Sequence, residues 1–329
     1  MKPRICIVGA GSISPFHIEA AEAAGFELFA ICARPDSNRA RLLFKRFGFK
    51  KLFSDLSEIE SSKPDAIAIL SNTENLFKIY QNMKLLQVPI LIEKPVVNSI
   101  YEFPDDVDLD CNDTLVGYNR RFYSSVQFVK KHLNEVTPAN SNWTISELSS
   151  FSDSKNDLRI KAIRENAVHI LDLMAYLFGS VKNISTERIF DSNGIKFISS
   201  LVKFNSGAVA TINLSLNSPN LYGGKILTTK FLLQLKPIEI LEQYSRIEIF
   251  DPNKDSLTRR YKLSGPNWKI DQVDLEFKAG FYKQYTEFKN LVEGIPRVRG
   301  ATLRDAKYAL TLAEALLDSK FVSDSFSSN

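Results

Sequence analysis

The sequence of 329 residues has few of the residue types that build disulfide frameworks and metal centres. It contains three cysteines (Cys6, Cys32 and Cys111), no Cys-x-x-Cys pair, and only three histidines. This argues against a disulfide-stapled fold, and no metal site is predicted. We expect the cysteines to be small buried hydrophobic residues in a reducing compartment.

Long apolar runs and an excess of charge of one sign are also missing. No apolar run approaches the ~20 residues of a membrane helix, and the apolar stretch before the first glycine turn is too short for a signal peptide. The 42 Lys and Arg against 38 Asp and Glu give a formal charge of +4, and the basic residues are scattered. We therefore expect a cytoplasmic protein with neither nucleic acid nor membrane as a partner.

The remaining composition is that of a globular protein of two domains. Hydrophobic residues make up 44% of the chain and charged residues 24%. Domains of roughly 100–200 residues make two domains the first expectation for this length.

The first third of the chain alternates short apolar strands with helices. Ile5-Cys6-Ile7-Val8 is a continuous apolar run, as in a strand that is covered on both faces. Such alternation predicts an α/β domain with a parallel, doubly wound sheet. Further strands are expected at residues 28–32, 66–70, 89–92 and 115–118, and helices at residues 14–24, 38–47 and 76–86.

The pattern changes after Tyr118. An amphipathic helix is expected over residues 160–178, and alternating runs between residues 186 and 250 predict a mostly antiparallel sheet with one exposed face. Helices at 280–292 and 303–318 close the chain. We therefore predict a first domain over residues 1–118 and a second, α+β domain over residues 119–329, whose closing helices can pack back on the first.

A glycine-rich turn follows the first strand. In Gly9-Ala10-Gly11, the first glycine permits a tight turn, and the second lets the backbone approach a pyrophosphate at the N-terminus of the next helix. Ser14 stands where a third glycine is usual. At the first strand–helix junction of a doubly wound sheet, this pattern predicts a dinucleotide site that includes Gly9, Gly11, Ser12 and Ile13.

The end of the second strand bears on the choice of cofactor. An acidic residue there would bind the ribose hydroxyls of NAD, whereas this sequence has Arg34, with Ser37 and Arg39 close behind. Arginine and serine can bind a 2′-phosphate, which favours NADP. NAD stays possible if Asp36 takes the acidic role.

Several motifs together resemble the glucose–fructose oxidoreductase/inositol dehydrogenase (Gfo/Idh/MocA) family. They are the Gly-x-Gly turn with His17, then Glu93-Lys94-Pro95, then Tyr118-Asn119-Arg120-Arg121-Phe122. The segment from Glu165 to Asp172 is similar to the family's Asp-x-Gly-x-His-x-x-Asp helix. The resemblance spans nearly the whole chain, and it implies a Rossmann domain followed by a domain with a large, mostly antiparallel sheet.

The resemblance also implies hydride transfer between a nicotinamide and a hydroxyl-bearing carbon of a sugar, cyclitol or nucleotide sugar. Lys94 would stabilise negative charge on the reacting oxygen, and His169 would exchange the hydroxyl proton. Glu165 would orient the pair, and Asp172 would bind a substrate hydroxyl. A structural His169 is the alternative.

Further residues are assigned with these. Arg121 and Arg164 could clamp an anionic group of the substrate, although solvated arginines fit the sequence equally well. The remaining expected site residues are Asn166 and Tyr282 for the substrate, and Ser71, Asn72, Glu93 and Lys94 for the cofactor.

Some stretches depart from the family pattern. Residues 71–76 replace its usual Pro-Asn loop and histidine, and residues 158–164 replace its small-residue run. The sequence is therefore consistent with two functions: an NADP-dependent oxidoreductase, and a non-catalytic nucleotide-binding regulator or scaffold. By analogy with the family we expect a homodimer or homotetramer.

Overall fold

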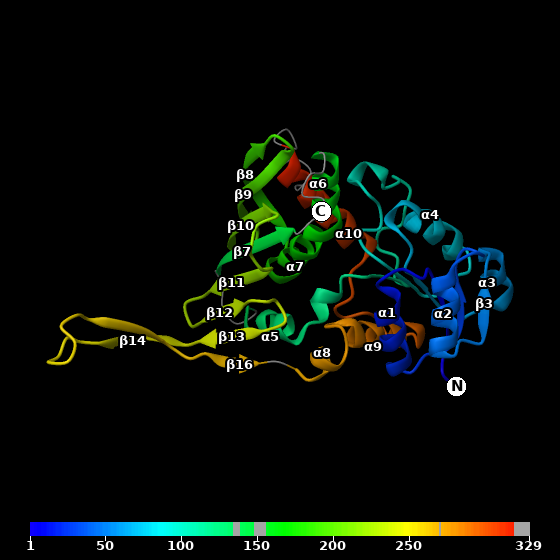
Figure 1. Ribbon diagram of the computed structural model, residues 1–329, viewed down its shortest axis with the longest axis horizontal. Helices are drawn as coiled ribbons and strands as arrows, with labels where there is room; N and C mark the ends of the chain where they lie inside the picture. The colour runs from blue at the N-terminus through cyan, green and yellow to red at the C-terminus, as the bar shows by residue number, and fades with distance from the viewer. Residues whose placement is uncertain (134–138, 148–155, 270, 319–329) are drawn as a thin grey trace. The chain divides into compact units, whose positions relative to one another are not determined.

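The computed structural model describes residues 1–133, 139–147, 156–269 and 271–318, which form two compact units (Figure 1). The first unit comprises Met1–Tyr123 and Val273–Glu314. The second comprises residues 124–272 and the chain from Ala315. The first unit thus runs on to Tyr123 and includes a segment near the C-terminus.

The first unit contains a six-stranded parallel sheet, which confirms the α/β prediction. Its strand order is β3-β2-β1-β4-β5-β6, and every neighbouring pair is parallel. The order reverses beside β1, where doubly wound sheets bind their ligands. The strands are β1 (Arg4–Val8), β2 (Glu27–Cys32), β3 (Lys51–Phe53), β4 (Ala66–Ile69), β5 (Ile90–Ile92) and β6 (Thr114–Val116), and the helices between them are α1 (Ser14–Ala23), α2 (Asn38–Phe47), α3 (Leu56–Ser62) and α4 (Thr73–Lys84).

Strand β3 and helix α3 were not expected from the sequence. The strand has only three residues, two of them exposed, so it carries almost no apolar signal. The helix does have a signature: Asp55 accepts from Ser57 N–H, and Glu58 accepts from Asp55 N–H in a capping box. The Asp-x-x-Glu spacing is a start signal for a helix.

The C-terminal helices complete the core of this unit. Helix α9 (Phe281–Val292) follows the short helix α8 (Val273–Glu276) and lies beside α1 (Figure 1). Phe281, Tyr285 and Phe288 are buried in the same cluster as Ile5 and Phe26. The core of the nucleotide-binding unit therefore includes residues far along the chain from its strands.

A segment after α9 extends the parallel sheet at its β6 edge. Val116 N–H donates to Ala301 O at 2.9 Å, in an antiparallel bridge. The carboxylate of Glu287 accepts from the N–H groups of Arg299 and Gly300, at 2.8 and 2.6 Å. Helix α10 (Leu303–Leu317) follows.

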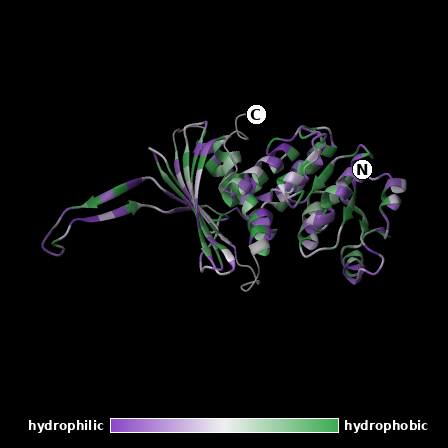
Figure 2. Ribbon diagram, turned by 90° about the horizontal axis from the view of Figure 1, so that it is seen from above, coloured by the Kyte–Doolittle hydropathy of each residue, from purple (hydrophilic) through white to green (hydrophobic). Residues whose placement is uncertain are grey.

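The second unit contains an eight-stranded sheet. Its order is β16-β13-β12-β11-β7-β10-β9-β8, and only the β7–β10 pair is parallel. The prediction of a mostly antiparallel sheet is confirmed, and hydrophobic and hydrophilic residues alternate along its strands (Figure 2). The strands are β7 (Asn140–Glu147), β8 (Val181–Asp191), β9 (Gly194–Phe204), β10 (Val209–Leu216), β11 (Gly223–Leu227), β12 (Leu232–Leu235), β13 (Leu241–Tyr244) and β16 (Asn267–Lys269).

Helices lie on one face of this sheet (Figure 1): α5 (Ser124–Leu133), α6 (Asn156–Ala162) and α7 (Val168–Phe178). The indole of Trp143 is fully buried and meets the ring of Phe178 edge-on. Gly224 leaves room for that indole, because a Cβ there would lie 2.6 Å from its ring. The helix expected over 160–178 is present as one helical stretch that ends at Phe178, and within it a π-helical segment, Ile163–Ala167, joins α6 to α7.

A separate two-stranded hairpin is inserted between β13 and β16. It consists of β14 (Arg246–Phe250) and β15 (Arg260–Ser264), and it extends away from the eight-stranded sheet (Figure 1). The sequence assigned the first of these strands to the large sheet, because periodicity cannot tell which strand is a neighbour of which. We call this hairpin, residues 246–264, the arm.

Candidate nucleotide site and catalytic residues

The turn after β1 requires its first glycine. Gly9 has a φ of +112°, and a Cβ there would lie 2.7 Å from Leu70 O at the end of β4. Its N–H donates to Cys32 O, which joins the turn to the end of β2. The hydroxyl of Ser14 donates to Gly9 O at 3.2 Å. Ser14, which stands where a third glycine is usual, therefore stabilises the turn through this hydrogen bond.

Helix α1 begins at this turn without a side-chain cap. Its N-cap residue is Ile13, whose side chain cannot accept a hydrogen bond, and Pro15 lies in its first turn. The helix has ten residues, so its dipole and N-terminal N–H groups favour an anion at this end.

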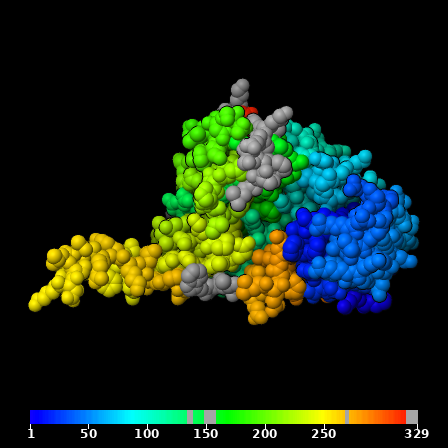
Figure 3. Space-filling view, in the orientation of Figure 1, coloured from blue at the N-terminus to red at the C-terminus, as the bar shows by residue number. Residues whose placement is uncertain are grey.

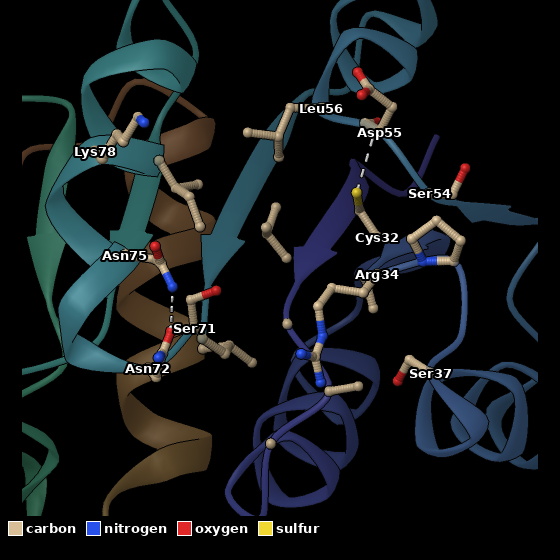
Figure 4. Close-up of a pocket in the computed structure, with 18 of the residues that line it drawn as sticks. Cys32, Arg34, Ser37, Ser54, Asp55, Leu56, Ser71, Asn72, Asn75 and Lys78 are labelled. Carbon is tan, nitrogen blue, oxygen red and sulfur yellow. Dashed lines mark hydrogen bonds between the residues drawn. The ribbon is translucent and has the colours of Figure 1, made fainter.

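A cavity of about 720 Å³ opens above the turn, lined by residues of the first unit alone. Arg34 and Ser37 lie on one side of it, and Ser71, Asn72 and Asn75 lie on the other (Figure 4). Its size is in the usual range for a small-molecule site. It lies at the carboxyl ends of β1, β2 and β4, where the strand order reverses. Turn, helix terminus and cavity together suit a dinucleotide.

The structure places the predicted cofactor residues as follows. Ser37 caps α2 by accepting from Ala40 N–H at 3.2 Å, and its own hydroxyl hydrogen stays available to a ligand. Asp36 and Arg39 are exposed and lie outside the cavity lining. The lining includes the predicted residues Gly9, Gly11, Arg34, Ser37, Ser71 and Asn72, and it does not include Ser12, Ile13, Arg39, Glu93 or Lys94.

The sequence interpretation missed two parts of the lining. One is the β3–α3 connection, where hydrogen bonds from Ser57 lower the pKa of Asp55 and so favour a negative charge. The other is one face of α4, whose lining residues are three or four residues apart in the sequence, as residues on one face of a helix are. The residues missed are Ser54, Asp55 and Leu56, and Asn75, Lys78, Ile79 and Asn82.

A buried polar cluster lies behind the Glu93-Lys94-Pro95 motif. His17 Nε2 is 3.0 Å from Glu93 Oε1, and His17 Nδ1 is 3.0 Å from the hydroxyl of Tyr285. Burial, and after it the charge of Glu93, raise the pKa of Tyr285 well above its usual range, so this hydroxyl stays a donor. Gly117 packs on the carboxylate, because a Cβ there would lie 2.5 Å from Glu93 Oε1. Nothing in the sequence pairs residue 17 with residue 285.

Lys94 follows β5 at the carboxyl edge of the parallel sheet. Its N–H donates to Glu93 Oε2 at 3.3 Å, and the residue is half-buried. β5 is the neighbour of β4, whose end contributes Leu70 and Ser71 to the cavity lining. Lys94 therefore lies on the ligand-binding edge of the sheet, outside the cavity itself.

The other predicted catalytic residues, Glu165 and His169, and the predicted substrate residue Asp172 belong to the second unit. Glu165 lies in the π-helical segment, and His169 and Asp172 lie on α7. Glu165 is 3.8 Å from Lys161 Nζ, and Asp172 is buried. Segments of π-helix occur often at functional sites. The structure thus gathers these three residues on the helical stretch that the sequence indicated.

A buried carboxylate fixes the π-helical segment. Asn166 Nδ2 donates to Glu147 Oε2 at 3.0 Å, and the Tyr222 hydroxyl donates to Glu147 Oε1. Glu147 is buried at the end of β7. The predicted substrate residue Asn166 therefore has a structural contact that the sequence did not reveal.

The remaining predicted substrate residues have varied surroundings. Arg121 is buried and forms an ion pair with Asp305, at 3.2 Å. The charge of Arg121 and hydrogen bonds from Thr302 outweigh burial and hold the pKa of Asp305 below its usual range. Tyr282 stacks on the ring of Phe277, and Arg164 lies half-buried in the π-helical segment.

The cysteines are buried thiols, as expected. Burial raises the pKa of Cys6 to about 12 and that of Cys32 to about 11. Among the residues that the structure describes, no group of three or more His, Cys, Asp and Glu could hold a metal ion. Within the same ranges, no helix has the length and apolarity needed to cross a membrane.

Comparisons with known proteins agree with this geometry. Residues 3–109 match the family model GFO_IDH_MocA, an oxidoreductase family with an NAD-binding Rossmann fold. No curated protein sequence matches the chain.

Solved structures share the fold along nearly the whole chain. A dehydrogenase (MviM) from Clostridium difficile has a TM-score of 0.76 at 19% identity, covering 97% of this chain and 100% of its own. UDP-N-acetylglucosamine 3-dehydrogenase GnnA from Acidithiobacillus ferrooxidans has a TM-score of 0.73 at 16% identity, covering 96% of this chain and 97% of its own. A levoglucosan dehydrogenase in complex with NADH has a TM-score of 0.75 at 17% identity, covering 97% of each chain.

The residues that match the family model include the glycine turn, the reversal of strand order and the whole cavity lining. They include every strand of the parallel sheet except the last, β6. Residues 3–109 thus form a Rossmann domain that matches the NAD-binding domain of the Gfo/Idh/MocA oxidoreductase family.

Proposed function

We propose that the protein is an NADP(H)-dependent oxidoreductase that acts on a hydroxyl-bearing carbon of a sugar, cyclitol or nucleotide sugar. The observation that carries the proposal is the cavity between the Gly9–Gly11 turn and Arg34, on the sheet edge that also bears Lys94. Relatives named for levoglucosan and for UDP-N-acetylglucosamine support this class of substrate.

The end of β2 supports NADP. Arg34 lines the cavity, and a guanidinium can bind a 2′-phosphate through two hydrogen bonds. Asp36, which could have bound the ribose of NAD, lies outside the lining. Lys78 adds a second positive charge to the lining, and Asp55 a negative one. Arg34 and Ser37 are therefore proposed to hold the 2′-phosphate.

The proposed chemistry gives one role to each of four residues. A bound nicotinamide supplies the hydride acceptor or donor. The Lys94 ammonium would donate a hydrogen bond to the reacting oxygen and stabilise the negative charge that develops on it. His169 would take the proton of the substrate hydroxyl, or return it in the reverse direction. Glu165 would orient these groups, and Asp172 would bind a neighbouring hydroxyl.

Lys94→Ala tests the proposal. Because Lys94 lies outside the cavity lining, we expect NADPH to bind with nearly parental affinity while turnover with an accepted sugar substrate is abolished. Lys50→Ala removes an exposed lysine of the same unit and serves as the matched control. Unchanged turnover of the Lys94 variant would refute its catalytic role.

A non-catalytic nucleotide-binding regulator is the second candidate. Two predicted substrate residues are occupied by structural contacts, Arg121 with Asp305 and Asn166 with Glu147, which favours this alternative. It would be supported if NADPH bound tightly while a broad panel of sugars and nucleotide sugars produced no change in the absorbance of the reduced nicotinamide.

A further inference from the structure

Cys111 lies in direct contact with a lysine side chain of the first unit. The Lys84 ammonium donates to Cys111 Sγ at 2.6 Å, and the carboxylate of Asp113 accepts from the same thiol at 2.5 Å. Lys84 and Asp113 also form an ion pair with one another. A thiol, an amine and a carboxylate therefore meet at one point, and we call these three residues the Lys84–Cys111 cluster.

Two segments of the chain bring this cluster together. Lys84 is the last residue of α4, whereas Cys111 and Asp113 lie just before β6. Arg297 Nη1 donates to the carbonyl oxygens of Cys111 and Thr114, at 3.0 and 2.7 Å, and so fixes the backbone that carries the thiol. The hydroxyl of Thr114 lies 3.2 Å from Cys111 Sγ. The sulfur is therefore held in place beside the amine.

The cluster is open to small solutes. The side chains of Lys84 and Asp113 are 31% and 38% exposed, whereas Cys111 is 6% exposed. Helix α4 and the chain that leads to β6, drawn in shades of cyan, lie at the surface of their unit (Figure 3). A molecule as small as hydrogen peroxide can therefore reach the sulfur past the two charged groups.

The charged neighbours suit this thiol to oxidation. The thiolate is the form that attacks peroxide, and an adjacent ammonium favours it. Burial alone would lower the pKa of Lys84, but hydrogen bonds with Asp113 and Cys111 raise it, so the ammonium is the resting form. Cys6 and Cys32 differ, because burial raises their pKa values to about 12 and about 11 and keeps them protonated at neutral pH.

We propose that hydrogen peroxide converts Cys111 and Lys84 into a reversible sulfur–nitrogen cross-link. In the first step the sulfur attacks peroxide, the O–O bond breaks, and the thiol becomes a sulfenic acid while its proton leaves in the released water. In the second step Lys84 Nζ passes one proton to Asp113 and attacks the sulfur. The S–N bond forms, the S–O bond breaks, and the hydroxide leaves as water with a second proton from the nitrogen. The sulfur loses two electrons, and peroxide is reduced to water.

The geometry favours the second step. Atoms held within roughly 3–3.5 Å of one another are positioned to react, and this nitrogen and sulfur are 2.6 Å apart. The link joins the end of α4, one face of which lines the nucleotide cavity, to the chain before β6. A thiol reductant reverses it, since two thiols become a disulfide while Cys111 and Lys84 are restored. This chemistry does not depend on whether the protein oxidises a sugar.

Tryptic digestion of the full chain tests the proposal. In the reduced protein, trypsin cleaves after Lys84 and releases residues 79–84 and 85–120, since Lys94 precedes a proline. A cross-linked Lys84 is no longer a cleavage site. Limited treatment with hydrogen peroxide should therefore give a single peptide, residues 79–120, that is two hydrogen atoms lighter than its sequence predicts. Dithiothreitol should restore the two ordinary peptides.

Matched variants separate the link from simple oxidation. Lys84→Arg keeps the positive charge but removes the amine, so Cys111 should proceed to the sulfinic acid without a link. Lys50→Arg makes the same change at an exposed site of the same unit and should cross-link like the parent. Far-ultraviolet circular dichroism shows that each variant is folded. Cys6 and Cys32 are the internal comparison, and both should remain free thiols after the treatment.

Thermal unfolding gives a second readout. The linked parent should unfold several degrees higher than the reduced parent, because the link constrains the unfolded chain. Peroxide should leave the unfolding temperature of Cys111→Ser unchanged. Ordinary cleavage after Lys84 in a parent whose Cys111 is oxidised would overturn the proposal, and so would equally fast oxidation of Cys6 or Cys32. A linked peptide that retains an oxygen atom would overturn the condensation step.

Discussion

His17 Nε2 and Glu93 Oε1 lie 3.0 Å apart, behind the motif that supplies Lys94. The imidazole thus lies between the carboxylate of Glu93, near its Nε2, and the hydroxyl of Tyr285, near its Nδ1. Histidine in the first helix thus links the end of β5 to the C-terminal helix α9.

Replacing this histidine should destabilise the first unit. In His17→Leu, the buried hydroxyl of Tyr285 and the carboxylate of Glu93 lose a polar partner, which costs about 1–3 kcal/mol of unfolding free energy. Urea unfolding measures this loss. Tyr285→Phe removes one hydroxyl from the same cluster and should cost less, about 1 kcal/mol. A His17→Leu variant as stable as the parent would show that the cluster contributes nothing to folding.

Gly9 and Gly11 should respond differently to alanine. At Gly9, a Cβ would approach Leu70 O to 2.7 Å from a backbone of positive φ, so Gly9→Ala should lower both stability and nucleotide affinity. At Gly11, the nearest atom would be 3.8 Å away, so Gly11→Ala should fold normally. It should still weaken NADPH binding, because its methyl group would meet the pyrophosphate. Thermal unfolding and fluorescence titration separate the two effects, and equal behaviour of both variants would contradict this assignment.

Arg34→Asp should move the cofactor preference from NADPH toward NADH. A carboxylate at the end of β2 repels the 2′-phosphate and can accept hydrogen bonds from ribose hydroxyls. The ratio of the two dissociation constants measures the change, which we expect to be about tenfold or more, since hydrogen bonds to charged groups contribute about 1.5–3 kcal/mol. Arg39→Asp makes the same charge change outside the cavity lining and should alter the ratio little. Equal affinity of the parent for both cofactors would count against the role of Arg34.

The Arg121–Asp305 pair should make stability depend on pH. The pKa of Asp305 is lowered in the folded state, so its contribution is present above the ordinary value near 4 and is lost as the pH falls through the lower folded value. In Asp305→Asn, the free energy of unfolding measured with urea should therefore fall less than in the parent as the pH is lowered.

Arg121→Met should cost about 1 kcal/mol at neutral pH, because it removes the cation from a carboxylate whose side chain is 37% exposed. An identical pH profile for the parent and Asp305→Asn would place the titration elsewhere.

The sequence predicted the elements that have strong local signals. Helix α2 occupies the expected residues 38–47, and the glycine turn lies where the apolar run of β1 ends. Long-range relationships were not predictable in this way. The contact between His17 and Tyr285 spans 268 residues of the chain. The contact between Asn166 and Glu147 forms because the end of β7 lies next to the π-helical segment in space. Such contacts depend on tertiary packing, which neither periodicity nor spacing encodes.

The placement of α9 in the first unit affects the order in which the protein can fold on the ribosome. All six strands of the parallel sheet have been synthesised by residue 116, but Phe281, Tyr285 and Phe288 have not. Until then the apolar surface around Ile18 and Phe26 lacks its cover, and His17 lacks its hydroxyl partner. The nucleotide-binding unit therefore completes its core only after the whole eight-stranded sheet has been translated, and a fragment that ends at Tyr123 would expose that surface permanently.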